Sequence, residues 1–295
     1  MLFGEHAVVY GNAALACPLP VTLRVAVEAG AGTWRAPAWH LALHLDAVDK
    51  PAQALRTLLD HLDVPWRDLA FTLEGELPPG AGLGSSAALS IATARAALAY
   101  LGRPASRSDV EEATLAAERV FHGNPSGLDH TVILHEQAIL FRRGTPAYVE
   151  RLRIAEPLPI VVAQVQHGAD TGKMVAGVAA RRQRYPDVMD PLLRAMEALI
   201  PEARRGLEQG DLALLGELAT VNHAFLSALG VSTPALDAAC HMARGAGATG
   251  AKLTGAGGGG CIFAFCPAEK QAAVEEALRV MCLEVFSTMI PSQDP

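Results

Sequence analysis

The sequence predicts a protein built from both helices and strands and divided into two lobes. The chain has 295 residues, of which 51% are hydrophobic. This is enough for one large core or two modest ones, because domains usually contain about 100–200 residues. Strand-like and helix-like segments occur in each half, and a polar, proline-containing stretch at residues 146–157 separates the halves. We therefore predict one lobe at residues 1–155 and a second at residues 156–295.

The first half is expected to contain short strands and longer helices. The strand segments are rich in apolar and β-branched residues, and they cover residues 2–10, 21–29, 71–74 and 138–142. The helical segments have apolar residues at helical spacing or an unusual richness in alanine, and they cover residues 51–62, 85–101 and 108–122. Ser108 and Glu111 form a capping box for the last of these helices, and Gly102 ends the one before it.

The second half is expected to begin with a strand and to continue with helices. The strand covers residues 160–166, and the helices cover residues 171–184, 190–208, 211–229 and 233–244. Thr233 supplies the N-cap of the last helix and Pro234 occupies its first position. Two apolar segments, at residues 250–254 and 261–266, flank a run of glycines and predict two strands joined by a loop. A closing helix is expected at residues 268–285.

Composition excludes several classes of function. The net charge is −7 and both signs are interspersed, so no basic stripe is present and we expect no nucleic-acid partner. Five scattered cysteines without a Cys-x-x-Cys pair favour reduced thiols over disulfides or a zinc site. A signal-like segment and a window of about 18 uncharged apolar residues are both missing. We therefore expect a soluble, cytoplasmic protein with no membrane partner.

The strongest local motif joins a predicted strand to a predicted helix, and it reads Pro78-Pro79-Gly80-Ala81-Gly82-Leu83-Gly84-Ser85-Ser86. Its glycines permit a tight turn, and the helix start offers free N–H groups and the positive end of a dipole. It is not a Walker A loop, because no Gly-Lys-Ser/Thr follows, and Ser85 replaces the third glycine of the dinucleotide-binding fingerprint. We expect a phosphate to bind here, at Pro79, Gly80, Ala81, Gly82, Leu83, Gly84, Ser85 and Ser86, in preference to a plain glycine-rich turn.

Two carboxylates follow on either side of a helix end. Glu118 lies on the predicted helix, and Asp129 comes eleven residues later, after Gly123-Asn124-Pro125. Phosphoryl transfer uses one acid to help hold Mg²⁺ and another near the attacking hydroxyl. Taken alone, Glu118 would more commonly be a solvated helix residue, and Asp129 a turn residue or a helix cap. They are site candidates only because of the motifs around them.

Two further segments are candidates for ligand contact. Lys252-Leu253-Thr254-Gly255-Ala256 is followed by four consecutive glycines between apolar strands. This pattern is typical of backbone that approaches a ligand or adopts positive φ angles. Glu5-His6 follows the first predicted strand, and its acid and imidazole suit hydroxyl or carboxylate groups. An isolated Glu-His pair would ordinarily have no function.

In order along the chain, three of these motifs resemble the signature motifs of the GHMP kinases: Phe3-Gly4-Glu5-His6-Ala7-Val8-Val9-Tyr10-Gly11, the Pro-Pro-Gly-Ala-Gly-Leu-Gly-Ser-Ser segment and Lys-Leu-Thr-Gly-Ala-Gly-Gly-Gly-Gly. The first motif and Gly-Asn-Pro-Ser-Gly-Leu-Asp are most similar to those of the mevalonate kinases within that family. The resemblance extends from residue 2 to about residue 266. It implies a two-lobed α+β fold, with an N-terminal lobe like ribosomal protein S5 domain 2, a ferredoxin-like C-terminal lobe and the active site in the cleft.

The resemblance also implies roles for particular residues. Ser86 and Glu118 match the family's magnesium-binding serine and glutamate, and Asp129 matches its catalytic aspartate. The segment from Gly80 to Ser86 would wrap the phosphates of ATP. The residues implied near the acceptor, mevalonate, are Glu5, His6, Asp129, Thr171 and Ala256. The implied activity is transfer of the γ-phosphate of ATP to the 5-hydroxyl of mevalonate with Mg²⁺ as cofactor, and family habit suggests a homodimer.

One departure concerns a lysine. Mevalonate kinases carry an Ala-Pro-Gly-Lys stretch before the first motif, and this sequence begins after that point. Either residues precede Met1 in the complete protein, or the enzyme works without that lysine. Of the four lysines in the sequence, Lys173 and Lys252 lie beside motif positions. We hypothesise that Lys173 approaches the phosphates in place of the missing lysine.

Other functions remain as alternatives. A kinase of the same family acting on phosphomevalonate, homoserine or a sugar would share the phosphate motifs. Only the residues of the acceptor pocket would distinguish these kinases from one another. A non-catalytic relative that binds ligand as a regulator is a second alternative, although Ser86, Glu118 and Asp129 together argue against it. A diphosphomevalonate decarboxylase is a third, but its first motif normally lacks the Glu-His-Ala-Val-Val pattern.

Overall fold

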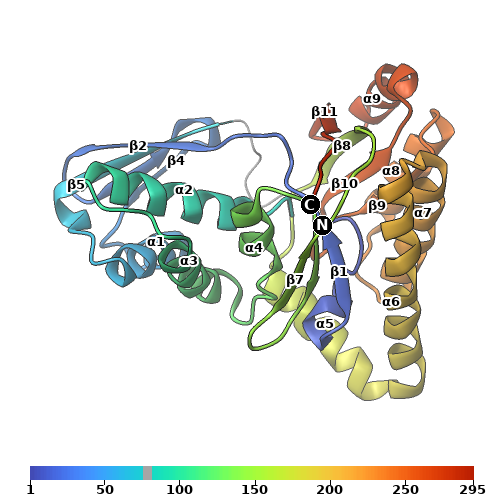
Figure 1. Cartoon of the computed structure of the whole chain (residues 1–295), viewed down its shortest axis with the longest axis horizontal. Coiled ribbons are helices and arrows are strands. Elements are labelled where there is room, and N and C mark those ends of the chain that lie inside the picture. Colours follow the sequence, from blue (N-terminus) through green and yellow to red (C-terminus); the bar gives the residue numbers. More distant parts are fainter. Residues whose placement is uncertain (76–81) are drawn as a thin grey trace. The chain divides into compact units, whose positions relative to one another are not determined.

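The computed structural model describes residues 1–75 and 82–295, which form two compact units (Figure 1). The larger unit comprises residues 1–20, 82–83 and 135–295, and the smaller unit comprises residues 21–75 and 84–134. Pro79, Gly80 and Ala81 of the expected phosphate loop lie outside the described residues. The division of the chain at residue 155 stays a prediction from sequence.

The smaller unit contains, within its described residues, a four-stranded sheet of order β2-β5-β3-β4. Its strands are β2 (Arg24–Ala29), β3 (Thr33–Ala36), β4 (Leu41–His44) and β5 (Leu69–Glu74). Strand β3 runs parallel to β5, whereas β2 and β4 pair antiparallel with their neighbours. Exposed and partly buried residues alternate along β4 and most of β2, so one sheet face meets solvent and the other packs on helices.

The helices of the smaller unit have the bounds α1 (Lys50–His61), α2 (Ser85–Tyr100), α3 (Arg107–His122) and α4 (Leu128–His135), of which the last residue of α4 belongs to the larger unit. Trp34 and Phe71 from the sheet pack with Leu58 of α1 in one buried core. Helix α3 is capped by Ser106, whose hydroxyl accepts from the Asp109 N–H at 3.2 Å. The predicted cap at Ser108 is therefore two residues late.

The larger unit contains two antiparallel sheets among its described residues. The first has the order β1-β6-β7, with bounds β1 (Ala13–Ala16), β6 (Ile139–Arg142) and β7 (Tyr148–Arg151). The second has the order β11-β8-β10-β9, with bounds β8 (Leu158–Gln166), β9 (Gly250–Leu253), β10 (Gly260–Phe265) and β11 (Glu284–Ile290).

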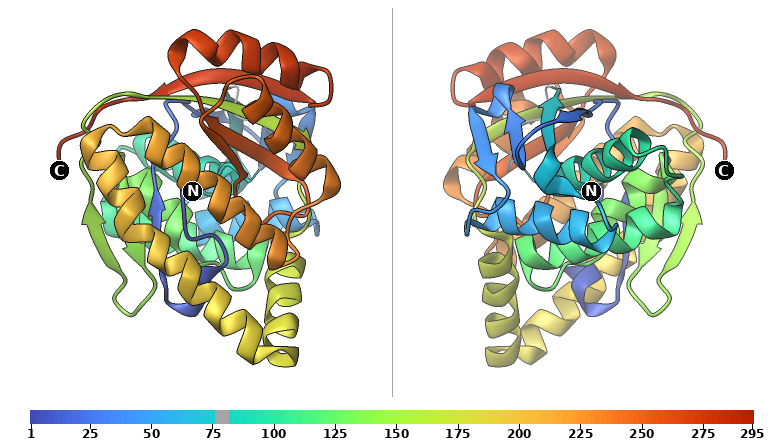
Figure 2. Two further views of the ribbon diagram at one scale, coloured as in Figure 1. Left: turned by 90° about the vertical axis from the view of Figure 1, so that its right-hand side faces the viewer. Right: turned by 90° about the vertical axis from the view of Figure 1, so that its left-hand side faces the viewer.

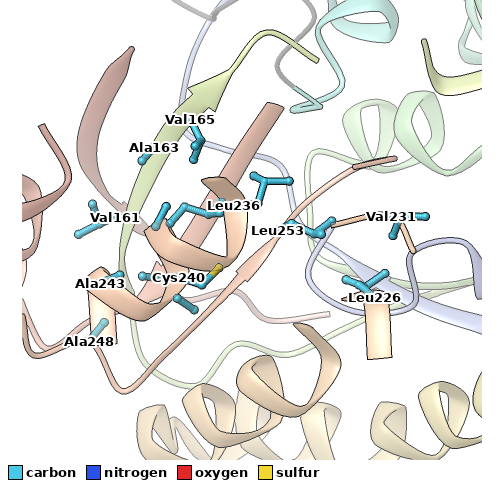
Figure 3. Packing of buried hydrophobic residues seen from close by; sticks show 14 of the residues in the cluster. Val161, Ala163, Val165, Leu226, Val231, Leu236, Cys240, Ala243, Ala248 and Leu253 are labelled. Atoms are coloured by element: carbon cyan, nitrogen blue, oxygen red, sulfur yellow. The ribbon is translucent and has the colours of Figure 1, made fainter. Parts of the chain in front are cut away.

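Helices cover the second sheet of the larger unit on both faces. Their bounds are α5 (Thr171–Arg184), α6 (Pro186–Gln209), α7 (Leu212–Ala228), α8 (Pro234–Gly245) and α9 (Gln271–Arg279). Along β8, Val161 and Ala163 pack in one core with Cys240 of α8 (Figure 3), whereas Ile160 and Val162 pack in a second core with residues of α6. Helix α9, drawn in red, lies along β11 (Figure 2). This two-sided burial explains the continuous apolar run of β8.

Most predicted elements are confirmed, and two are wrong. Residues 2–10 were expected as a strand and a turn ending at Gly11-Asn12, but Phe3 makes only a bridge to Leu15, and Ala7–Tyr10 form a 3₁₀ helix, η1. The break comes at His6, whose φ of 60° is incompatible with a strand. The closing helix was expected to reach residue 285, but α9 ends at Arg279 and β11 follows. Antiparallel pairing of β11 with β8 outweighs helical periodicity there.

No helix among residues 1–75 and 82–295 is long and apolar enough to cross a membrane.

Candidate active site

The expected phosphate loop ends at the start of α2 in the smaller unit. Gly84 is the N-cap with a left-handed backbone, and Ser85 and Ser86 open the helix without an acidic residue in the first turn. The first N–H groups of a helix lack intrahelical partners and carry a partial positive charge. This helix start is therefore suited to an anion. Gly82 and Leu83, the preceding described residues, belong to the larger unit, where Leu83 packs on a core.

Ser86 is hydrogen bonded to a residue that the sequence analysis did not select. Its hydroxyl lies 3.1 Å from Nε2 of His122, the last residue of α3. The same Nε2 lies 3.7 Å from Oε2 of Glu118, one helical turn earlier. His122 therefore connects the two residues expected to hold a metal. Its i, i+4 spacing from Glu118 was the only signal in the sequence.

Glu118 is buried, with a side chain only 3% exposed. Its Oε1 has no hydrogen-bond partner among the described residues. The pKa of Glu118 is raised to about 8, chiefly by burial and also by the charge of Asp129, while the hydrogen bond from the hydroxyl of Ser86 acts in the opposite direction. A buried carboxyl group with an unpaired oxygen is an unsatisfied acceptor that a cation would complete.

Asp129 is the second residue of α4 and is half-buried. Its Cβ and Cγ lie 3.7 Å from the position that a Cβ would occupy at Gly84. Its charge also acts on the carboxyl group of Glu118. The smaller unit therefore brings Ser86, Glu118 and Asp129 together at the start of α2, as the sequence predicts.

The described residues contain no cluster of three or more His, Cys, Asp or Glu side chains that would hold a metal alone. Mg²⁺ seldom needs such a cluster, because it binds through one or two carboxylates, waters and substrate phosphates. The unpartnered Oε1 of Glu118 and the hydroxyl oxygen of Ser86 are ligand atoms of the kind that Mg²⁺ prefers. The residues present fit this ion.

The first motif lies in the core of the larger unit. Glu5 is 1% exposed and His6 is 5% exposed. His6 has a φ of 60° and precedes η1, a backbone conformation that carries strain and recurs at functional sites. Its Nε2 donates to the carbonyl oxygen of Ala256 at 2.8 Å, so the first motif contacts the third.

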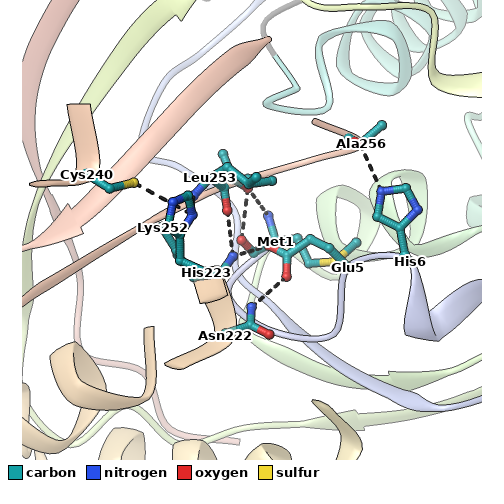
Figure 4. Close-up of polar contacts among 10 residues, drawn as sticks. Met1, Glu5, His6, Asn222, His223, Cys240, Lys252, Leu253 and Ala256 are labelled. Atoms are coloured by element: carbon teal, nitrogen blue, oxygen red, sulfur yellow. Dashed lines mark hydrogen bonds and ion pairs between the residues drawn. The ribbon is translucent and has the colours of Figure 1, made fainter. Parts of the chain in front are cut away.

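Glu5 makes a buried ion pair with Lys252, whose side chain is fully buried (Figure 4). Lys252 Nζ also donates to the carbonyl oxygen of Leu253 at 2.8 Å. The second carboxylate oxygen of Glu5 accepts from Nδ2 of Asn222 at 3.1 Å. Both oxygens of Glu5 therefore have protein partners. Direct contact of Glu5 with a substrate stays a prediction from sequence.

The residues around this pair were not predicted from the sequence. Leu253 N donates to Nδ1 of His223 at 3.3 Å, and Nε2 of His223 lies 3.0 Å from Oδ1 of Asp237. One signal was present in the sequence: Lys252 interrupts an apolar strand segment, and a lysine there is stable only if an acid neutralises it.

The third motif forms a tight turn between β9 and β10. Its five glycines, Gly255, Gly257, Gly258, Gly259 and Gly260, all have positive φ. At Gly257 a Cβ would collide with the carbonyl oxygen of Val231, and Gly258 N donates to that same oxygen at 2.7 Å. Glycine is therefore required at Gly257 by both conformation and space. Ala256, between these glycines, is half-buried.

Thr171 is the first residue of α5 and is half-buried. Asp170 caps this helix by accepting from the Lys173 N–H at 3.0 Å. The Lys173 side chain is exposed in the first turn, and its proposed approach to phosphates stays a prediction. Lys252, the other lysine beside a motif, is engaged by Glu5.

Comparisons with known proteins give consistent matches. The model of the GHMP kinases N terminal domain matches residues 49–137, and the model described as GHMP kinases C terminal matches residues 203–283. Mevalonate kinase of Thermococcus gammatolerans is 34% identical over 95% of this chain and 90% of its own length. Mevalonate kinase of Pyrococcus horikoshii is 33% identical over the same shares.

Solved structures give the same result. The structure of L. major mevalonate kinase in complex with R-mevalonate has a TM-score of 0.87 and 27% identity, covering 100% of this chain and 94% of its own. Methanococcus jannaschii mevalonate kinase has a TM-score of 0.81 and 24% identity, covering 99% of this chain and 95% of its own. At that identity the second match supports the fold alone.

Replacing Gly257 tests the turn. We expect Gly257→Ala to lower the melting temperature by about 2–10 °C, because the new Cβ meets the Val231 carbonyl in a strained backbone. Gly245→Ala is the matched control, since a Cβ at Gly245 meets nothing within 4 Å. Equal melting temperatures for Gly257→Ala and the wild type would contradict this account of the turn.

The raised pKa of Glu118 predicts a pH dependence without metal. Between pH 4.5 and about 8 the folded protein holds a proton at Glu118 that the unfolded chain has lost, so this residue's contribution to the free energy of unfolding falls as pH rises. Melting temperatures in the presence of a chelator should therefore fall less from pH 5 to pH 8 in Glu118→Gln than in the wild type.

Glu112→Gln is the control for this pH series, because Glu112 is exposed on the same helix. It should follow the wild-type curve. Identical slopes for Glu118→Gln and wild type would show that Glu118 has an ordinary pKa.

Proposed function

The chain belongs to the GHMP kinase family, and we propose that it transfers the γ-phosphate of ATP to the 5-hydroxyl of mevalonate, giving 5-phosphomevalonate for isoprenoid biosynthesis. The observation that carries this proposal is that mevalonate kinases more than 30% identical match 95% of the chain. Membership of this kinase family implies that ATP is the phosphate donor. The product's role in the mevalonate pathway follows from the proposed acceptor.

The site supports this proposal through a division of tasks. The segment from Pro79 to Ser86 binds the phosphates, and the positive N-terminal end of α2 attracts their negative charge. Glu118 and Ser86 would hold Mg²⁺ through the unpartnered Oε1 and the hydroxyl oxygen. When bound, this ion would neutralise negative charge on the β- and γ-phosphates. Glu118 would hold this ion as a carboxylate, so metal binding would be favoured as pH rises through the raised pKa of this group.

Asp129 aligns the acceptor hydroxyl for in-line attack and accepts its proton or its hydrogen bond. Its half-buried position at the start of α4 keeps one side accessible. Phosphoryl transfer leaves little covalent chemistry to the protein, so orientation of this hydroxyl is the main contribution of a side chain. His6, Thr171 and Ala256 line the acceptor pocket, and Glu5 belongs to the same motif.

Lys173 is proposed to approach the phosphates of ATP. Its exposed ammonium in the first turn of α5 is available for phosphate, whereas Lys252 is held by Glu5. We also propose a cytoplasmic homodimer, from family habit.

Other acceptors remain rivals. Phosphomevalonate, homoserine and galactose kinases share the phosphate motifs, and a non-catalytic regulator or a diphosphomevalonate decarboxylase would share the fold. Mevalonate is favoured over these by the first motif and by the relatives above.

An acceptor panel tests the function directly. With ATP and Mg²⁺, we expect ADP release with mevalonate and background rates with phosphomevalonate, homoserine and galactose. Turnover with another acceptor and none with mevalonate would move the assignment to that acceptor. Nucleotide binding without turnover on any of the four would favour the regulator.

Replacing the catalytic carboxylate tests the mechanism. Asp129→Asn should lower kcat by about 10²–10⁴-fold, because the hydroxyl loses its proton acceptor, while the Kd for ATP changes little. Asp187→Asn is the matched control, since Asp187 is exposed in the first turn of α6. Near-native turnover by Asp129→Asn would remove Asp129 from the catalytic role.

A further inference from the structure

The first and third motifs meet at a charged pair that has no access to solvent. Glu5 is 1% exposed and Lys252 is fully buried, although 247 positions separate them in the chain (Figure 4). An unpaired charge in such a position costs several kcal/mol, so each residue requires the other. Nζ of Lys252 also lies 5.1 Å from the ring centroid of Phe263 on β10. This ring covers another side of the ammonium group.

The hydrogen bonds of Glu5 leave no free carboxylate oxygen. Oε1 accepts from Lys252 Nζ, and Oε2 accepts from Nδ2 of Asn222 at 3.1 Å. A carboxylate with both oxygens engaged in the core is poorly placed to bind a substrate. The side chain of its neighbour along the chain, His6, also reaches the third motif, at the carbonyl oxygen of Ala256.

The contact of His6 with Ala256 determines which ring nitrogen carries hydrogen. A carbonyl oxygen only accepts, so we assign the hydrogen to Nε2. Burial lowers the pKa of His6, and the charge of Arg181 lowers it too, whereas the Ala256 hydrogen bond and Glu5 raise it. The neutral ring then has a lone pair on Nδ1, and that nitrogen has no hydrogen-bond partner among the described residues.

We propose that Glu5 and Lys252 are positioning residues: their ion pair holds His6 as an Nε2–H imidazole, whose Nδ1 accepts a hydrogen bond from a hydroxyl of the acceptor substrate. The tautomer is a property of the protein alone, and the identity of the hydroxyl rests on the proposed function. Arg181 and Glu5 are the charged groups that act on this ring.

The strain at His6 agrees with this role. Its φ of 60° and ψ of −43° are an unfavourable combination for a residue with a side chain. The Glu5 pair on one side and the Ala256 hydrogen bond at the ring fix the residue in that conformation. Without the pair, the backbone is expected to relax and the ring to leave the Ala256 carbonyl.

A double-mutant cycle with Glu5→Gln and Lys252→Met separates positioning from direct contact. Each single variant should lower the melting temperature by about 6–20 °C and lower kcat/KM for mevalonate by about 10–100-fold, with KM for ATP nearly unchanged. The double variant should regain most of the melting temperature, because no unpaired charge remains, but not the lost kcat/KM. Lys270→Met, at an exposed lysine, is the control.

Two results would overturn the proposal. Loss of kcat/KM in Glu5→Gln, with Lys252→Met near wild type, would show that Glu5 contacts the substrate itself. Recovery of both melting temperature and kcat/KM in the double variant would reduce the pair to a purely structural element.

The tautomer is tested without reference to activity, by long-range ¹H–¹⁵N NMR of the histidine rings, with His6→Gln assigning the His6 signals. At pH 7.5 the free protein should show the neutral Nε2–H form, and Lys252→Met should show a mixture of tautomers. Mevalonate, but not ATP alone, should shift the Nδ1 resonance.

The Nδ1–H form in the wild type, or an unchanged tautomer in Lys252→Met, would overturn the positioning role. A correct tautomer with no mevalonate-induced shift would instead refute mevalonate as the acceptor, which separates this inference from the proposed function.

Discussion

The buried ion pair of Glu5 and Lys252 is the interaction on which the larger unit's part of the site depends. Lys252 stands in strand β9 with no exposed surface, so its charge requires an acid inside the core. Glu5 supplies that acid from the other end of the chain. The pair thus joins the first motif to the strand that leads into the glycine turn, and it places His6 against Ala256.

The smaller unit has a different constraint, an unsatisfied carboxyl group. Glu118 is buried with one oxygen unpaired, and its pKa is raised to about 8. The carboxyl group of Glu118 is therefore suited to bind a cation in place of its proton. The nearby start of α2 is suited to bind phosphate. His122 links Glu118 to Ser86. In the larger unit, the charges of Glu5 and Lys252 neutralise each other. In the smaller unit, Glu118 has an unpaired oxygen that could bind a cation.

Local patterns in the sequence predicted α2, α5 and α8 closely, because alanine content, helix caps and proline act within a few residues of where they stand. They failed at η1, because the strained backbone of His6 prevents a strand there. They also failed at β11, because pairing with β8 outweighs the local preference for a helix. The motif resemblance located Ser86, Glu118 and Asp129, which the smaller unit brings together. The pairing of Glu5 with Lys252 and Asn222 was missed, because these residues lie far apart in the chain. The contact of His122 with Ser86 was missed, because it joins two different helices.

The first and third motifs are joined by a buried pair of opposite charges, Glu5 and Lys252. The most direct measurement is ¹H–¹⁵N NMR of the lysine ammonium groups at neutral pH, with the Lys252 signal assigned from Lys252→Met. We expect a slowly exchanging NH₃⁺ signal for Lys252, since its Nζ is enclosed by Glu5 and the Leu253 carbonyl. A neutral or rapidly exchanging Lys252 would contradict it.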